Sequence, residues 1–237
     1  GGQIRLHLRA RTGTRIEETV RLVDQVEDVI RDEVGVDEIE GVLDNIGIPN
    51  SGISLSYSNS GLIGTGDADV LVSLKKEHRP TADHVRRLRA RLQREFPGTL
   101  FYFLPADIVS QTINFGLPAP FDVQIVGRDQ AGNRAVAAAL AAKIRQVAGA
   151  VDVRVQQPAD QPRFHVDVNR AKAAEIGLTE RDVANSVLLS LNGSGQVAPS
   201  YWLNPRIGIQ YLVNIRAPEH VMDSLDEVLD PDAREIG

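Results

Sequence analysis

The chain has 237 residues, of which 42% are hydrophobic and 24% are charged, and its formal net charge is -6. This composition is that of an ordinary soluble globular protein, and no window approaches the ~18 apolar residues that a membrane-spanning helix needs. The negative balance argues against nucleic acid as the main partner, because phosphate binding draws on a basic surface. The absence of cysteine excludes disulfides, thiolate metal sites and cysteine nucleophiles, which fits the cytoplasm and the bacterial periplasm equally well.

The first block predicts a strand, a helix and a second strand. Hydrophobic residues alternate at the start of the chain, at Ile4, Leu6 and Leu8. Thr14 and Glu17 have the spacing of a capping box. The helix that follows carries an apolar stripe on an otherwise charged surface, at Ile16, Val20, Val23, Val26 and Ile30. We expect Gly35 to end this helix and a strand to lie near Asp37–Asp44.

The second block repeats this order after a long loop, Asn45–Asp67. Val70–Leu74 has the composition of a strand, Ala82–Phe96 that of an amphipathic helix, and Thr99–Leu104 that of another strand. The order β-α-β, loop, β-α-β predicts a ferredoxin-like, split βαβ unit of the α+β class. The glycine and two prolines in Asn114–Pro120 predict its boundary.

The third block has half of the same pattern. Phe121–Val126 and Val151–Gln156 are predicted strands, and Ala131–Val147 is a predicted helix. A lone β-α-β unit has an open sheet face and an unpaired edge, so we expect another segment to close it.

The last block begins with alternating hydrophobic residues at Phe164, Val166 and Val168, followed by an Ala-rich helix that ends at Gly177. Thr179 and Asp182 predict the capped start of a second helix. A hairpin with arms Gln196–Leu203 and Ile209–Ile215 is expected next, and a short helix near His220–Leu229.

Several of these segments, taken in order, resemble one family. They are the strand and turn Leu6–Thr14, the aromatic strand Phe101–Ala106 with its Leu-Pro-Ala end, and the strand and helix Phe164–Gly177. The chain thereby resembles the second periplasmic loop of resistance–nodulation–division (RND) inner-membrane proton antiporters. This resemblance implies a first C-terminal porter subdomain at residues 1–115, half of the second at 116–159, and most of the docking subdomain at 160–237. It also implies that the closing half of the second porter subdomain follows residue 237.

The resemblance further implies the setting of the whole pump. It is a homotrimer in the bacterial inner membrane, with this portion in the periplasm beside its own membrane domain and N-terminal periplasmic loop. Its expected partners are a periplasmic adaptor protein and an outer-membrane channel. The proton-relay residues belong to membrane helices outside this chain, and no cofactor is expected.

The glycine-rich loop Asn45–Asp67 admits two interpretations. It lacks the Gly-Lys-Ser/Thr ending of a phosphate loop, and many long loops are simple connectors. By the resemblance it corresponds to a switch loop between substrate sites, in which the candidate substrate contacts are Ile48, Leu55, Tyr57 and Leu62.

The aromatic run at Phe101, Tyr102 and Phe103 is the second candidate site. Alternation places the two phenylalanines on one face and the tyrosine on the other. One face is expected to be core, but the resemblance makes Phe101 and Phe103 substrate-binding residues in a cleft between the porter subdomains. Arg154 corresponds to an arginine at the cleft entrance, although an arginine on a strand is more often simply solvated.

The other candidate sites have less support in the sequence. The five histidines and single methionine show no ligand spacing, and Asp67 with Asp69 could hold a hard cation only weakly. No catalytic constellation of a hydrolase is present. Tyr201 and Trp202 in the predicted hairpin are candidate docking residues, unless Trp202 packs inward on the preceding helix.

We therefore expect the substrate-capture and docking portion of a proton-driven pump that exports small amphiphilic molecules. The alternative is a stand-alone ferredoxin-like module that binds a small ligand and has a regulatory role. RNA binding is disfavoured by the negative charge and by the lack of basic residues around the strand aromatics.

Overall fold

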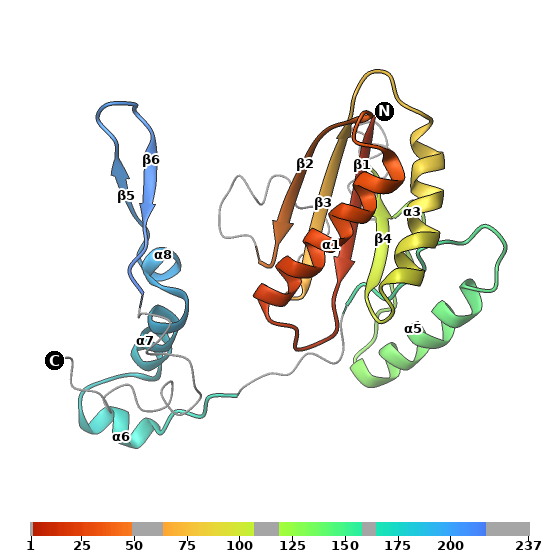
Figure 1. The fold of residues 1–237 in the computed structure, drawn as a ribbon. Coiled ribbons are helices and arrows are strands. Elements are labelled where there is room, and N and C mark those ends of the chain that lie inside the picture. The colour runs from red at the N-terminus through yellow and green to blue at the C-terminus, as the bar shows by residue number, and fades with distance from the viewer. Residues whose placement is uncertain (1, 49–63, 107–118, 158–164, 217–237) are drawn as a thin grey trace. The chain divides into compact units, whose positions relative to one another are not determined.

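The computed structural model describes residues 2–48, 64–106, 119–157 and 165–216. The chain divides into two compact units, Gly1–Pro162 and Arg163–Gly237 (Figure 1). The predicted strand residue Phe164 and the predicted helix His220–Leu229 lie outside the described residues. None of the helices in the described ranges is long and apolar enough to cross a membrane.

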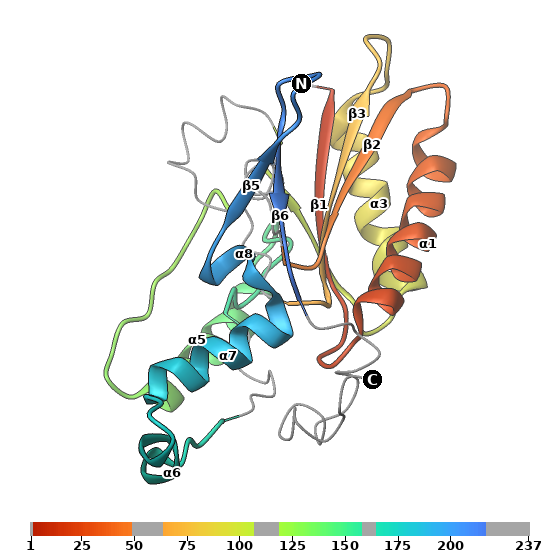
Figure 2. The ribbon, with the colours of Figure 1, turned by 90° about the vertical axis from the view of Figure 1, so that its left-hand side faces the viewer.

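The first unit contains a four-stranded antiparallel sheet with the strand order β2-β3-β1-β4. Its elements, in chain order, are β1 (Gln3–Arg9), α1 (Ile16–Val34), β2 (Ile39–Ile46), β3 (Asp67–Leu74), α3 (Thr81–Glu95) and β4 (Leu100–Leu104). Figures 1 and 2 show α1 and α3 on the same face of the sheet. This is the predicted ferredoxin-like arrangement, and it confirms the α+β fold class.

The core lies between the sheet and the two helices. Ile4, Leu6 and Leu8 of β1 are at most 2% exposed, as the predicted alternation requires. They pack with Val23, Val26 and Ile30 of α1 and with Leu88 and Leu92 of α3. The other two residues of the predicted stripe, Ile16 and Val20, are 42% and 39% exposed and lie outside the core. Each such side chain contributes ~1.5–3 kcal/mol on burial, so this layer supplies the main stabilisation of the unit.

The two ends of α1 differ in how well the sequence predicts them. Gly35 ends the helix with φ 93°, as predicted, because this conformation is strained for residues with a Cβ. The predicted capping box at Thr14 is wrong, because the helix begins one residue later with Arg15 at the N-cap and no side-chain cap bond. The Thr14 hydroxyl instead donates to the Arg11 carbonyl at 2.6 Å.

The third block forms its helix but not its strands. Helix α5 (Gln130–Ile144) starts at Asp129, whose side chain accepts a hydrogen bond from the Ala131 N–H. The predicted strands Phe121–Val126 and Val151–Gln156 belong to no ladder in the structure, which corrects that part of the prediction. The physical reason is that the described residues provide no strand to lie between them, and an unpaired extended segment is not a sheet.

In its described residues, 165–216, the second unit contains three helices and a hairpin. They are α6 (Arg170–Glu175), α7 (Glu180–Asn192), α8 (Ser194–Val197), β5 (Ser200–Leu203) and β6 (Gln210–Val213). The capping box of Thr179 and Asp182 at the start of α7 is confirmed. The hairpin is also confirmed, with Trp202 opposite Tyr211, but its first arm is shorter than predicted because Ser194–Val197 form α8. Residues 165–168 form no strand, contrary to the prediction.

Candidate functional site

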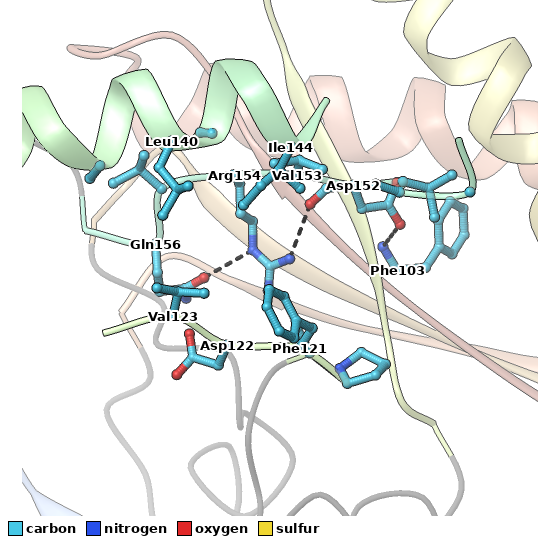
Figure 3. A pocket seen from close by; sticks show the side chains of 18 of the residues that line it. Phe103, Phe121, Asp122, Val123, Leu140, Ile144, Asp152, Val153, Arg154 and Gln156 are labelled. Atoms are coloured by element: carbon cyan, nitrogen blue, oxygen red, sulfur yellow. Dashed lines mark hydrogen bonds between the residues drawn. The ribbon is translucent and has the colours of Figure 1, made fainter. Parts of the chain in front are cut away.

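A pocket of about 480 Å³ lies in the first unit. Arg89 of α3, Phe103 of β4 and the segment 149–156 line it. Figure 3 labels Phe103 together with Asp152, Val153, Arg154 and Gln156 of that segment. Helix α5 contributes an apolar strip of four residues, Ala137, Leu140, Ala141 and Ile144. The pocket therefore combines an apolar surface with a few charged groups, which is the usual make-up of a small-molecule site.

The segment 149–156 is fixed to the ferredoxin-like unit at Asp152. The two carboxylate oxygens of Asp152 accept hydrogen bonds from Nε and Nη2 of Arg89 at 2.7 and 2.9 Å. Oδ2 also accepts a bond from the backbone N–H of Phe103 at 3.1 Å (Figure 3). Two-point pairing of arginine with a carboxylate is among the strong hydrogen-bonded interactions, and the Asp152 side chain is 8% exposed.

Asp152 also has an unusual backbone. Its φ is 55°, in the left-handed region, where it is the one non-glycine residue among those described. Aspartate is tolerated there better than most residues, but the conformation still costs ~1 kcal/mol or more. The three hydrogen bonds to its carboxylate offset that cost and direct the chain across the edge of β4.

Arg154 follows Asp152 and lies in the same wall. Its guanidinium carbon is 3.6 Å from the centre of the Tyr102 ring, a cation–π contact. Its Nε donates to Gln156 Oε1 at 3.0 Å and its Nη1 to the Asp152 carbonyl at 3.4 Å. Burial lowers the pKa of Arg154 and raises the pKa of the Tyr102 hydroxyl, so both polar groups lie in a partly desolvated setting.

A charged cluster occupies the sheet face opposite the helices. His7 contacts Asp69 through Nδ1 at 2.7 Å and Asp67 through Nε2 at 3.1 Å, and its ring stacks on Tyr102. Arg9 pairs with Asp67, and Arg5 pairs with Asp69. Since each carboxylate already has a guanidinium partner, the cluster is an ion-pair network rather than a cation site. Within the described ranges, no His, Asp and Glu side chains are grouped to hold a metal ion.

The pocket brings together two of the predicted substrate-binding residues, Phe103 and Arg154. Phe101 does not line it. Phe101 lies opposite Leu8 on the helix-facing side of the sheet, is 3% exposed, and packs in the core against Phe96. Phe103 points to the same side but lies near the end of the strand, so it reaches the pocket.

The other predicted site residues lie elsewhere or outside the description. Ile48 is 65% exposed, lies two residues beyond the end of β2, and does not line the pocket. Leu55, Tyr57 and Leu62 lie outside the described residues. Tyr201 and Trp202 are 61% and 53% exposed on the hairpin, so Trp202 does not pack inward as a core residue.

Sequence reasoning missed Arg89 and Asp152 as site residues. They are 63 positions apart, and neither has a local pattern that points to the other. Tyr102 was placed on the correct face by alternation, but its contact with Arg154 depends on the path of the segment 149–156.

The chain belongs to the AcrB/AcrD/AcrF family of RND efflux permeases, whose family model matches residues 1–230. Among curated proteins, it is similar to Protein HelA of Legionella pneumophila, at 25% identity over 199 residues. Among solved structures, it is similar to a heavy metal efflux pump, with a TM-score of 0.68 and 21% identity over 96% of the chain.

This chain spans only a small part of these relatives. It covers 18% of HelA and 23% of the solved pump chain. Members of the family are inner-membrane transport permeases, and the chain shares the fold of one part of such a protein.

Proposed function

We propose that this chain is the periplasmic substrate-capture and docking portion of a proton-driven RND pump that exports small amphiphilic molecules. The pocket is the observation that carries this proposal. Its apolar strip on α5 and the Phe103 ring suit apolar groups of varied shape, since dispersion and stacking demand little fixed geometry. Arg89 and Arg154 give the same pocket a polar side.

The division into subdomains is part of the proposal. Residues 1–115 would form the first C-terminal porter subdomain, 116–159 half of the second, and 160–237 most of the docking subdomain. Large hydrophobic residues of the third block are exposed outside the pocket, among them Val126, Val136 and Val147. We propose that the rest of the second porter subdomain covers them in the full pump.

The hairpin supports the docking assignment. From Ala198 to Ile215 the only charged residue is Arg206, at the turn. Tyr201, Trp202, Leu203, Tyr211, Leu212 and Val213 are nevertheless exposed. Aromatic and aliphatic surface of this kind is typical of interface cores. The proposed partners are an adaptor protein and an outer-membrane channel, met by a trimer of the full pump.

Two other functions have less support. A stand-alone regulatory module is disfavoured by the family match over residues 1–230. The solved neighbour is titled a heavy metal efflux pump, but Asp67 and Asp69 in this chain are paired with arginines, which lowers their capacity to bind a cationic cargo.

The capture proposal is tested with Phe103→Ala in the full-length pump. Export of bulky apolar compounds should fall severalfold, because the ring forms one wall of the pocket. Val36→Ala is the matched control, since Val36 is 65% exposed and lies outside the pocket. Equal resistance of both variants across a broad compound panel, at equal expression, would count against the proposed site.

A further inference from the structure

The charged side chains that line the pocket carry as many positive as negative charges. They are Arg89, Asp122, Asp152 and Arg154. Asp122 is exposed, whereas Asp152 is 8% and Arg89 22% exposed. The buried pair therefore has the greater influence on a bound molecule, because charge interactions strengthen as water is excluded.

Arg89 has a second contact that faces the pocket. Its guanidinium carbon is 5.1 Å from the centre of the Phe103 ring. An arginine beside an aromatic ring can hold a molecule that has both an aromatic body and an anionic group. In this structure the anionic group is supplied by the protein itself, since Asp152 occupies both guanidinium donors that point to it.

The segment 149–156, here called the strap, depends on the same carboxylate. Asp152 ties the strap to α3 and β4, and the strap then supplies Asp152 to Gln156 to the pocket wall. If another anion takes the place of the Asp152 carboxylate, Arg89 stays paired and the strap loses this tie. With Asp152 displaced, Asp122 is the one protein carboxylate of the lining that faces Arg89 and Arg154, and the incoming anion restores the charge balance of the pocket.

We propose that Arg89 and Asp152 form a competitive anion subsite in this pocket: the anionic head group of an amphiphile displaces Asp152 from Arg89 and releases the strap. The inference rests on the proposed function of the pocket. It makes Arg89 the residue that selects anionic cargo and Asp152 a positioning residue that holds the subsite closed when no such cargo is present.

The test uses two dyes that differ only in one sulfonate group. 1-Anilinonaphthalene-8-sulfonate is anionic, and N-phenyl-1-naphthylamine is its neutral counterpart. Both are titrated fluorimetrically into the purified 237-residue chain. Asp152→Asn removes the competing charge and keeps a side chain that accepts the Phe103 N–H bond and tolerates the left-handed backbone.

In Asp152→Asn, the anionic dye should bind about tenfold more tightly, which corresponds to about 1.4 kcal/mol, and the neutral dye should change less than twofold. Arg89→Gln combined with Asp152→Asn should remove this gain, and Arg89→Gln alone should bind the anionic dye no more tightly than the wild-type chain does. Arg91→Gln is the control, because Arg91 lies on the same helix with a similar exposure of 24% but pairs with Asp32 and Glu95 outside the pocket.

Each other outcome is decisive. Equal shifts for the two dyes in Asp152→Asn would show that the substitution only loosens the strap, and the subsite would be rejected. Unchanged binding of the anionic dye in that variant would reject it as well. Phe103→Ala distinguishes failure of the subsite from failure of the proposed function. If this variant binds both dyes as tightly as the wild-type chain does, the pocket is not the capture site, whatever the Asp152 and Arg89 variants show.

Discussion

Asp44 of β2 lies in an unusual environment for a carboxyl group. Burial, together with the neighbouring carboxylate of Glu27 on α1, raises its pKa from 3.8 to about 8. One of its oxygens is buried without a hydrogen-bond partner. Because the folded-state pKa lies above the unfolded one, protonation favours the folded state. The free energy of unfolding should therefore fall as the pH rises from about 4 to about 8, by at most ~1.4 kcal/mol per pH unit for this group.

Asp44→Asn should remove this pH dependence, because the amide stays neutral and can donate to Glu27. We expect the variant to be more stable than the wild-type chain at pH 8 and close to it below about pH 4, where the Asp44 carboxyl becomes largely protonated in both states. Urea unfolding at several pH values measures the difference. Asp37→Asn, at an exposed position before β2, should keep the wild-type profile. A slope that persists in Asp44→Asn would show that other groups cause it.

Phe101→Ala should destabilise the first unit by ~3–5 kcal/mol, because it leaves a cavity in a packed core. The side chain is 3% exposed and belongs to the core cluster. Thermal unfolding measures the loss, with Val36→Ala as the exposed control. If Phe101→Ala unfolds at the wild-type temperature, Phe101 is not a core residue, and its predicted role in substrate binding returns to consideration.

The run Phe101–Phe103 shows how far sequence reasoning reaches at a site. Alternation correctly separates Tyr102 from its neighbours, since it depends only on strand geometry. The difference between Phe101 and Phe103 depends on where the helices and the strap end along the strand. The charge partners of Asp152 are likewise set by tertiary packing, so no local pattern could reveal them.

At the scale of elements, the N-terminus of α7 invites a direct test. The Thr179 hydroxyl accepts a hydrogen bond from the Asp182 N–H, and the Asp182 carboxylate accepts one from the Thr179 N–H. Thr179→Ala should cost ~0.5–2 kcal/mol of helix stability and speed amide exchange in the first turn of α7. Thr14→Ala is the matched control, because Thr14 does not cap α1. Faster exchange at α1 in that control would restore the predicted capping box.

The elements of the first unit were predictable because each has a local signal. Amphipathic stripes predict α1 and α3, alternation predicts β1, and strand composition predicts β3. The segments on either side of α5 have the composition of strands, as in Val123 and Ile125 or Val153 and Val155. Composition does not create a ladder, because a strand needs a neighbour to receive its hydrogen bonds.

At the scale of the whole chain, burial is concentrated in the first unit. In the described part of the second unit, the one buried hydrophobic side chain is Ala173. We expect amides of β1 and β3 to exchange with solvent at least ~1,000-fold more slowly than those of β5 and β6, since protection follows local stability. Hydrogen exchange of the 237-residue chain measures this. Similar protection in both sheets would show that the second unit has a core of its own.

The docking proposal predicts a contact of the hairpin in the assembled pump. A photo-reactive residue in place of Trp202, which is 53% exposed, should label an adaptor or outer-membrane channel protein in intact cells. The same residue at Val36, in the first unit, serves as the control and should not. If Trp202 forms cross-links only within its own chain, the hairpin is not a docking element.

The charged network behind the sheet has a consequence for the tolerance of β1 to variation. Ile4, Leu6 and Leu8 are buried on one face, and Arg5 and His7 on the other are 6% and 0% exposed. An ordinary strand with one solvent-exposed face accepts many substitutions at every second position. In β1, a replacement at any of these five consecutive positions either opens a cavity or leaves a buried charge without its partner. In saturation mutagenesis of the chain, substitutions should therefore be poorly tolerated at every position from Ile4 to Leu8. In most strands, tolerant and intolerant positions would alternate.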